Sequence, residues 1–267
     1  MSLPVIDHTP AFAQPVDVGL YSAADLVDRD SRMSSGVRVW PVNCDPPFGL
    51  WPADPCDPVD GMVKTGERSA PSDPFDPIVV WGFDQCDPAE PEPVLIERAE
   101  HALRFGERTA VEEHFIARVL ADAGTPDTVV SIVEAVGMVE AGLAGMRVNG
   151  VIHAPVQFAA LLERYGLIVR SGNRLRSPLG HRWAFGHGYT GALDDTIVGT
   201  GPVTVWRDAP TVNTALDGRT NNRIAVAERM VLPWTECAPV AVTINNEDDD
   251  GNGDGNGDGN GDGNGDG

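Results

Sequence analysis

Apolar residues recur at helical spacing in several parts of the chain, most clearly between positions 129 and 143. The pattern runs from Val129 through Val136 and Val139 to Leu143, with the apolar positions on one face. A second stripe follows Pro155 and stops before Gly166, a residue suited to end a helix. Its members are Phe158, Leu161, Leu162 and Tyr165. We expect two helices that pack on the same core.

Strand-like runs lie between and after these two helices. They cover residues 150–154, 167–169, 180–186 and 201–207. In the run 180–186, Trp183 and Phe185 fall on the same side of the strand. Segment 128–207 is therefore predicted to form one compact α/β unit, and the other segments are extensions of it.

The longest helical pattern lies upstream, from residue 94 to residue 123. Its apolar positions, interrupted once by Gly106, are Leu95, Ala99, Ala102, Leu103, Val111, Phe115, Val119 and Leu120. Gly124 and Pro126 follow in the order expected after a helix end. Thirty residues at about 1.5 Å each span roughly 45 Å, so we expect this helix to act as a strut.

The first 33 residues show little periodicity. Prolines at positions 4, 10 and 15 predict an extended arm up to residue 18, and residues 21–28 are compatible with one or two helical turns. An arm of this kind has little to fold against within its own subunit. We therefore expect it to dock on a neighbouring molecule.

The composition changes sharply between residues 34 and 93, where twelve prolines stand between positions 41 and 93. Proline excludes helix over most of this segment. Short β-type runs at 36–40 and 77–81 predict the limbs of a long, irregular β-hairpin with its tip between residues 60 and 72. Because an isolated two-stranded ribbon is marginally stable in water, we expect another surface to cover it.

Two further strands are predicted downstream, at 224–232 and 238–244, with Pro233 and Trp234 between them. From position 248 the chain is acidic and then repeats Gly-Asn-Gly-Asp four times. This tail has no apolar residues that could order it, so we expect it to be disordered. Asp, Asn and Gly at these spacings imitate part of a calcium-binding loop, but the bidentate Glu and the flanking helices are missing.

The net charge of the chain makes some classes of function unlikely. The chain of 267 residues has 40 acidic and 19 basic residues, a formal charge of −21. The tail from Glu247 onward holds eight of the acids, which leaves 32 acids and a charge of −13 for the rest. Such a surface repels nucleic acid phosphates, so sequence-specific DNA binding is not expected. No apolar run approaches the roughly 20 residues of a membrane span, and we expect the chain to stay in the compartment where it is made.

The four cysteines do not have the spacing of a zinc site. Cys44, Cys56 and Cys86 each stand before Asp-Pro, which indicates turns at the ends of strands. A disulfide framework that includes Cys237 is the less favoured interpretation, because a chain of this length can fold without one.

Residue types that carry out chemistry are scattered. His181 and His187 lack a third metal ligand nearby and are interpreted as loop and surface residues, as are His101 and His114 beside the long helix. His153, before a helix, is expected to bind backbone groups. The glycine-rich stretch 186–191 lacks the Lys-Ser/Thr of a phosphate loop and is interpreted as a tight loop. We expect no catalytic, cofactor-binding or metal-binding residues, and no enzyme.

An ordered set of short motifs resembles the axial domain of tailed-bacteriophage major capsid proteins, the HK-ninety-seven-like fold. The set runs through Ile152-His153-Ala154-Pro155, Gly166-Leu167-Ile168, Leu179-Gly180, residues 186–191 and Gly199-Thr200-Gly201-Pro202-Val203. With its flanks the resemblance covers roughly residues 20–245. The fold class it implies is α+β.

The resemblance implies a division of the chain into functional segments. These are an N-terminal arm (1–33), an extended loop (34–92), a spine helix with part of the peripheral domain (93–127), an axial domain (128–207), returning strands of the peripheral domain (208–246) and the acidic tail (247–267). In this family the extended loop lies over the adjacent subunit. Candidate residues for subunit interfaces are Trp40, Trp51, Lys64, Trp81 and Tyr189.

Some capsids of this fold join a loop lysine covalently to an asparagine of a neighbouring peripheral domain. Lys64 is the only lysine of this chain and lies in the predicted loop. The asparagines that could take this part are Asn213, Asn221 and Asn222. The reaction needs a buried, neutral amine beside a carboxylate, and an exposed loop lysine without a function is the alternative.

The function implied by the resemblance is that of a major capsid protein. It would form hexamers and pentamers of an icosahedral virion shell that encloses DNA without reading its sequence, and it would assemble in the host cytoplasm. Expected partners are a separate scaffolding protein, a portal and a decoration protein. One alternative is an encapsulin-like nanocompartment, although the proline-bearing arm is unlike a cargo-binding helix. Another is a calcium-binding module that uses the Asp/Gly/Asn tail.

Overall fold

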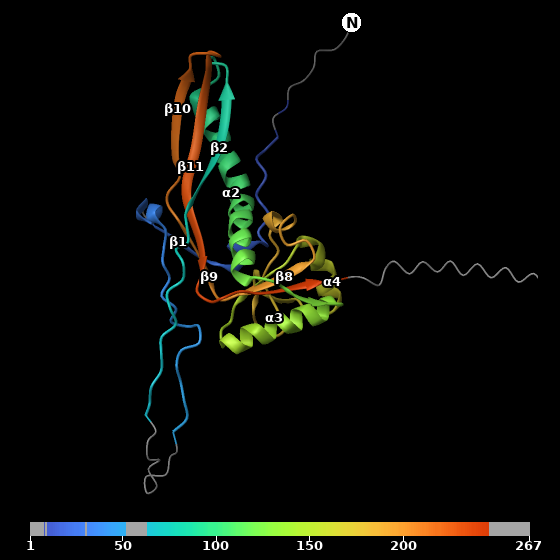
Figure 1. Cartoon of the computed structure of the whole chain (residues 1–267). Helices are drawn as coiled ribbons and strands as arrows, with labels where there is room; N and C mark the ends of the chain where they lie inside the picture. Colours follow the sequence, from blue (N-terminus) through green and yellow to red (C-terminus); the bar gives the residue numbers. More distant parts are fainter. Residues whose placement is uncertain (1–7, 9, 30, 52–62, 246–267) are drawn as a thin grey trace, which may run out of the picture.

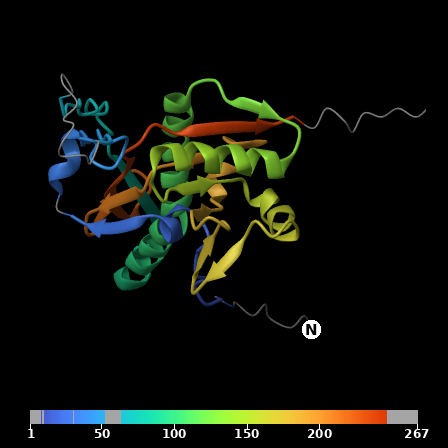
Figure 2. The same cartoon turned by 90° about the horizontal axis from the view of Figure 1, so that it is seen from below.

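The computed structural model describes residues 8, 10–29, 31–51 and 63–245 (Figure 1). The predicted tip of the extended loop lies partly outside these residues, and the acidic tail and the start of the arm lie outside them. One β-sheet runs beside a long helix along most of its length, and the other lies at the lower end of that helix (Figures 1 and 2). An extended loop projects from the base of the molecule (Figure 1).

The long helix α2 (Glu92–Ala123) has 32 residues and confirms the helix predicted over 94–123. It starts after Pro91, with Pro93 in its first turn, where a missing N–H costs nothing. It ends at Gly124, whose φ of +71° suits glycine. Its buried face includes an i, i+4 row of Leu95, Ala99, Leu103, Glu107, Val111, Phe115 and Val119.

The first sheet lies along α2. Its strands are β1 (Asp25–Asp28), β9 (Val203–Arg207), β11 (Asn222–Thr235), β10 (Thr211–Asp217) and β2 (Ile78–Cys86). The central strand β11 pairs with β10 and β2 along most of its length and with β9 at its end. Alternate residues of β2 are buried against the helix. A Cβ atom at Gly82 would lie 2.2 Å from the backbone N of Leu103, so this glycine allows the close crossing of β2 and α2.

The second sheet has seven strands in the order β3-β12-β8-β4-β7-β6-β5. Their bounds are β3 (Asp127–Val129), β4 (Val151–His153), β5 (Val169–Ser171), β6 (Arg174–Arg176), β7 (Arg182–Ala184), β8 (Thr196–Thr200) and β12 (Val240–Ile244). Helix α3 (Ile132–Met146) packs on β8 and β12, and α4 (Ala159–Arg164) follows the short 3-10 helix η2 (Val156–Phe158). Both predicted helices of this region are present, and Ser131 caps α3 by accepting a hydrogen bond from the Glu134 backbone N at 3.2 Å.

Two predicted strands occupy positions that were not expected from the sequence. Segment 201–207, assigned to the axial unit, contains β9, which pairs with β1 and β11 in the first sheet. Segment 238–244, assigned to the returning strands beside α2, contains β12, which pairs with β8 and β3 in the second sheet. The chain therefore passes between the sheets three times, from β2 to β3, from β8 to β9 and from β11 to β12. The predicted break at Pro233 is also wrong, because β11 continues through it to Thr235.

The extended segment differs from the predicted hairpin. Among its described residues, regular pairing between the two limbs is limited to one isolated bridge, Val37 with Phe75, because prolines remove the N–H donors that a ladder needs. The run 77–81, predicted as the second limb, begins β2 of the first sheet. A Cys44–Cys237 disulfide joins the first limb to the segment after β11. The sequence-based interpretation, which favoured cysteines without disulfides, was therefore wrong for this pair. The described Cys86 is a buried free cysteine.

The described part of the arm lies on the subunit's own long helix, whereas a neighbouring molecule was expected as its dock. The ring of Phe12 stacks on that of His101 with centroids 4.3 Å apart. The Arg108 Nη1 donates to the Val16 carbonyl O and to Asp17 Oδ1, at 2.8 Å each. After the arm, α1 (Leu20–Ala23) is a single helical turn, where one or two turns were predicted over 21–28, and β1 occupies the rest of that segment.

Candidate assembly interface

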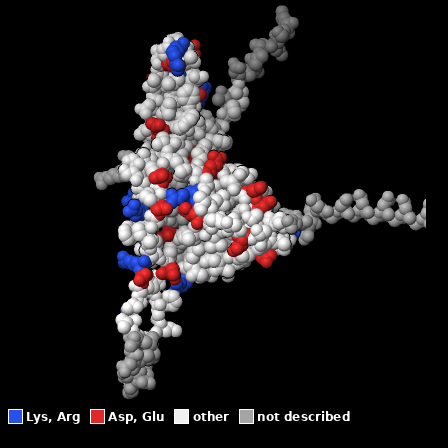
Figure 3. Space-filling view, in the orientation of Figure 1, with Lys and Arg blue, Asp and Glu red and all other residues white. Residues whose placement is uncertain are grey.

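The extended loop carries large apolar side chains that its own subunit leaves in solvent. Trp40 is 64% exposed, and the others are Val42, Phe48, Leu50, Trp51 and Val63. Isolated exposed apolar residues are ordinary, but a run of them on one projecting segment marks a contact surface. On the face seen in Figure 3, the outer part of the described loop shows uncharged side chains, and the charged ones gather where the loop leaves the body. This surface is therefore suited to being covered by another protein surface.

A second apolar surface lies on the face of the first sheet that points away from α2. The alternation along β2 leaves Val79, Trp81 and Phe83 exposed, with Trp81 at 64%. Phe83 is paired with Val226 of β11 and Val79 with Met230, and directly paired residues share a face. The described residues leave this strip uncovered, although the opposite face of the same strand is packed.

Of the residues predicted to lie at subunit interfaces, the three tryptophans are exposed and Tyr189 is buried. Trp40, Trp51 and Trp81 are accessible, and the Lys64 Nζ lies 4.8 Å from the centroid of the Trp51 ring. Tyr189 is 0% exposed, because the 3-10 helix η3 (His187–Tyr189) packs against α2. Tyr189 is thus a core residue, which corrects its assignment to a subunit surface.

Lys64 and two of the three asparagines considered for an intersubunit crosslink lie at opposite ends of the molecule. Lys64 belongs to the loop at the base of Figure 1, whereas Asn221 and Asn222 lie at the β10–β11 turn at its top. Asn213 lies in β10 with an exposed side chain. Within one subunit the loop points away from these asparagines, so any bond between them would join two copies of the chain.

Two buried glutamates of α2 anchor the start of the body. Glu112 accepts hydrogen bonds from the backbone N of Leu20 at 2.9 Å and of Gly188 at 3.1 Å. Burial raises the pKa of Glu112, and the two backbone N–H groups oppose that shift. Glu107 accepts from the Tyr21 hydroxyl at 2.7 Å and lies 3.3 Å from the Arg229 Nε. Neither was predicted from the sequence, although Glu107 occupies one position of an otherwise apolar i, i+4 row.

The buried histidines have structural partners. His153 Nδ1 lies 2.9 Å from the Tyr189 hydroxyl and Nε2 lies 2.9 Å from Thr200 Oγ1, so its partners are side chains and not the expected backbone groups. Burial lowers the pKa of His153 to about 3. His181, interpreted as a surface residue, is buried and accepts from the Gly150 backbone N at 3.2 Å. His187 is exposed.

Features of other kinds of site are missing from the described part of the chain. It contains no group of three His, Cys, Asp or Glu side chains placed to hold a metal ion. None of its helices combines the length and the apolar character needed to cross a membrane. Acidic side chains are scattered over the body on the face seen in Figure 3, and basic ones gather near the base of the loop and at the end of the first sheet. The tail considered for calcium lies outside the described residues.

Comparisons with known proteins identify the fold. No family model and no curated protein matches the sequence. Among solved structures, a chain of the mature capsid of bacteriophage PhiM1 is 13% identical with a TM-score of 0.50, over 92% of this chain and 93% of that one. A chain of Mycobacterium phage Adephagia is 14% identical with a TM-score of 0.54, over 90% and 95%. A virus-like particle protein from Pyrococcus furiosus is 8% identical with a TM-score of 0.54, over 84% and 91%.

These matches cover almost the whole of both chains, so the similarity extends over the whole fold and is not limited to one motif. At this level of identity they establish architecture. They agree with the order of arm, loop, long helix and sheets described above, and they confirm the predicted α+β class. This chain has the fold of tailed-bacteriophage major capsid proteins.

Proposed function

We propose that this chain is a major capsid protein, a structural subunit that assembles into an icosahedral shell around a phage genome. The observation that carries the proposal is the extended loop, which leaves apolar side chains such as Trp40 and Leu50 in solvent on a fold found in capsids. Association that covers these side chains is favourable, because it removes apolar area from water. Other copies of the chain are the simplest source of such a cover.

In this proposal the subunits form hexamers and pentamers. The loop and the outer face of the first sheet meet neighbouring subunits, the second sheet and its loops meet around the axis of each ring, and α2 links the two regions. Interfaces of this kind combine many modest contacts over a large area. A chain with a formal charge of −21 would enclose DNA without sequence-specific binding.

Electron microscopy of the purified, expressed chain tests this proposal. We expect closed shells of uniform diameter, or hexamers and pentamers that close into shells after a change of salt or pH. Analytical ultracentrifugation at several concentrations gives the corresponding sedimentation coefficients. A chain that remains a folded monomer at high concentration, with its loop packed on its own body, would overturn the proposal.

The expected partners belong to the same proposal. A separate scaffolding protein would direct curvature, a portal would occupy one vertex, and a decoration protein would bind the outside of the shell. Assembly would take place in the host cytoplasm without a membrane, and the product would be the virion capsid. Co-expression with neighbouring genes tests the need for a scaffold, which is expected to raise the fraction of closed shells.

A second candidate is a cellular nanocompartment of the encapsulin kind. The similarity to the Pyrococcus furiosus virus-like particle protein, with a TM-score of 0.54, favours keeping it. The contents of natively purified shells separate the two functions. Nucleic acid of genome length supports the capsid, and a packaged enzyme supports the nanocompartment.

A covalent link between subunits is a separate proposal. We propose that Lys64 is the amine and that Asn213, Asn221 or Asn222 of a neighbouring copy is the acceptor. A denaturing gel of mature shells tests it, because linked subunits run as oligomers and Lys64→Arg shells run as monomers. A monomer band from unmodified shells would contradict the link without affecting the proposed shell.

A further inference from the structure

The extended loop is attached to the body at two places along its stalk. The first is an apolar cluster of Met33, Val39, Phe75 and Leu232. There the Ser72 backbone N donates to the Val39 carbonyl O at 2.9 Å, and Arg118 lies over the Phe75 ring with its Cζ 4.5 Å from the centroid. This attachment holds the two limbs of the stalk together beside α2.

The second attachment lies further out along the stalk, at the Cys44–Cys237 disulfide. The two Cα atoms are 5.5 Å apart across a sequence separation of 193 residues. The Sγ atom of Cys237 packs against Gly201, where a Cβ atom would lie 2.9 Å from it. The stalk thus meets the turn between β8 and β9 at a point where glycine makes room for the sulfur.

The non-covalent contacts beside this disulfide are exposed. The Glu236 carboxylate accepts from the backbone N of Val42, from the backbone N of Asn43 at 2.7 Å and from Asn43 Nδ2 at 2.6 Å. Arg147 forms an ion pair with Asp45. Exposed pairs of this kind contribute about 0–1 kcal/mol each. They orient the stalk when it is in place, but alone they hold it weakly.

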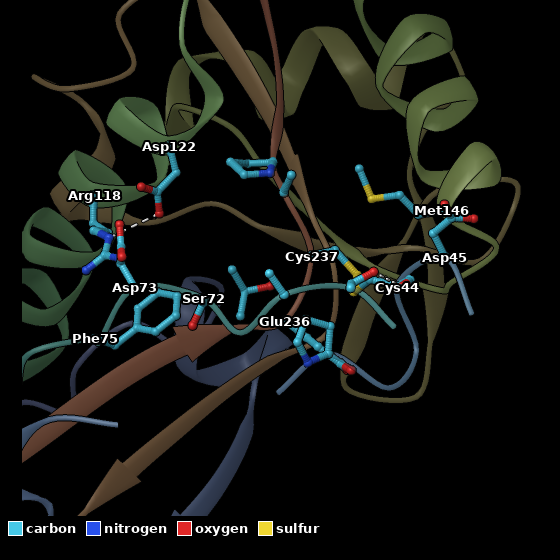
Figure 4. A pocket seen from close by; sticks show the side chains of 16 residues that line it. Cys44, Asp45, Ser72, Asp73, Phe75, Arg118, Asp122, Met146, Glu236 and Cys237 are labelled. Atoms are coloured by element: carbon cyan, nitrogen blue, oxygen red, sulfur yellow. Dashed lines mark hydrogen bonds and ion pairs between the residues drawn. A yellow bond between two sulfur atoms is a disulfide. The ribbon is translucent and has the colours of Figure 1, made fainter. Parts of the chain in front are cut away.

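Between the two attachments the stalk spans a hollow instead of packing on the body. The cavity has a volume of about 450 Å³ and is open to solvent. Figure 4 shows Phe75, Arg118 and Asp122 at one end and Cys44 and Cys237 at the other. Because little side-chain packing crosses this hollow, burial does not fix the angle of the stalk. A stalk held only at Val39 and Phe75 can pivot, whereas a second fixed point determines its direction.

We propose that the Cys44–Cys237 disulfide is a redox-controlled clamp that sets the direction of the extended loop and that closes after subunits have assembled. The timing rests on the proposed function, in which subunits assemble inside a cell and the particle then leaves it. A reducing cytoplasm keeps cysteine thiols reduced, and disulfides persist outside it. The open clamp lets the loop find its neighbour, and the closed clamp holds it there.

The closing step is thiol–disulfide exchange with a small-molecule disulfide such as oxidised glutathione. One cysteine, as its thiolate, attacks the external disulfide and releases one small thiol. The second cysteine thiolate then attacks the mixed disulfide and releases the other. The pair of cysteines loses two electrons and two protons, and the external disulfide is reduced to two thiols. Cys44 is half-buried and so remains accessible to this reagent.

Hydrogen exchange of the unassembled full-length chain tests the mechanical part. In oxidised protein, amides of segments 38–48 and 66–73 should exchange about tenfold more slowly than in reduced protein, since local opening controls exchange. Cys44→Ser and Cys237→Ser should exchange like reduced protein under both conditions. Cys86→Ala, which removes a buried thiol outside the clamp, should still respond to oxidation. Equal exchange of these segments in oxidised and reduced unmodified protein would overturn the clamp, whether or not a variant folds.

Thiol trapping tests the timing. Shells alkylated at the moment of lysis should carry modified Cys44 and Cys237, and shells treated with oxidised glutathione before alkylation should yield one linked peptide pair. A linked pair already present at lysis, or none after oxidation, would contradict the proposal. Failure of the chain to form shells would contradict the proposed function, but it would leave the exchange result on free subunits intact.

Discussion

Glu107 and Glu112 bring carboxylates into a face of α2 that otherwise contacts apolar side chains. Each is less than 5% exposed, yet each has partners from other segments. Glu112 receives the backbone N–H of Leu20 and that of Gly188, which connects the arm, the long helix and the loop before β8. Buried polar groups are tolerated when they are hydrogen-bonded. We therefore interpret Glu112 as a structural residue that holds these three segments together.

Replacing Glu112 by alanine leaves two buried N–H groups without an acceptor. Each unsatisfied donor costs about 1–3 kcal/mol, so we expect Glu112→Ala to lower the free energy of unfolding by about 3 kcal/mol. Urea unfolding of the subunit measures it. The neighbouring Glu113 is exposed, and Glu113→Ala should change stability by less than about 0.5 kcal/mol. Equal effects of the two substitutions would show that the hydrogen bonds of Glu112 are unimportant.

His153 should make the free energy of unfolding of the subunit depend on pH. Burial lowers the pKa of His153 in the folded chain to about 3, below the ordinary value of 6.5. Between these two pH values the unfolded chain binds a proton at this histidine and the folded chain does not. Its stabilising contribution is complete above pH 6.5 and falls as the pH decreases toward 3, by up to about 1.4 kcal/mol per pH unit. Unfolding between pH 6.5 and 5 should therefore show a shallower slope in His153→Asn than in the unmodified chain. His114→Asn, at an exposed position of α2, is the matched control for the loss of an imidazole.

At the scale of elements, the crossing of β2 over α2 depends on one residue. Gly82 brings the strand so close that a Cβ atom would lie 2.4 Å from the Ala99 carbonyl O. We expect Gly82→Ala to destabilise the subunit by about 1–3 kcal/mol, because strand and helix must separate. At Gly106, inside α2, an added Cβ atom would meet nothing within 4 Å, and Gly106→Ala should stabilise the helix by about 0.5–1 kcal/mol. Thermal unfolding should show shifts of opposite sign, and shifts of the same sign would refute this account.

The helices could be predicted from the sequence because their apolar faces repeat over many residues. Both α2 and α3 meet that condition. Strand β8 was missed, since all five of its residues are buried and no polar alternation marks it. Strand β10 was missed for the opposite reason, because its residues are mostly exposed. The sheet to which β9 and β12 belong depends on long-range pairing, which no local pattern encodes.

The candidate interface was predicted in part for the same reason. Tryptophans in a proline-rich segment have no core nearby, so the sequence indicates that Trp40 and Trp51 are accessible. Tyr189 follows glycines in an apparent loop, and its burial depends on α2, which is distant in the sequence. The Cys44–Cys237 disulfide likewise joins segments that approach one another only in the folded chain.

At the scale of the whole molecule, the first sheet is packed on α2 on one side, whereas on its other side only the end near the loop is covered and the strip along β2 is exposed. On the uncovered side of β2, Val79, Trp81 and Phe83 form an apolar strip beside the apolar residues of β11. The same chain places an apolar loop at its base (Figure 1). Apolar surface that stays in water in the isolated subunit contributes nothing to folding, so its effect appears in association.

Trp81 and Gln85 allow folding to be separated from assembly, because both lie on the exposed side of β2 and differ in apolar area. Trp81→Ser removes no intramolecular core contact and should change subunit stability by less than about 0.5 kcal/mol. Burying one large apolar side chain at an interface contributes about 1.5–3 kcal/mol, so the lowest concentration that supports shells should rise at least about tenfold. Gln85→Ser should leave the lowest concentration that supports shells nearly unchanged. Light scattering against concentration measures both, and unchanged assembly of Trp81→Ser would remove this face of the sheet from the subunit interface.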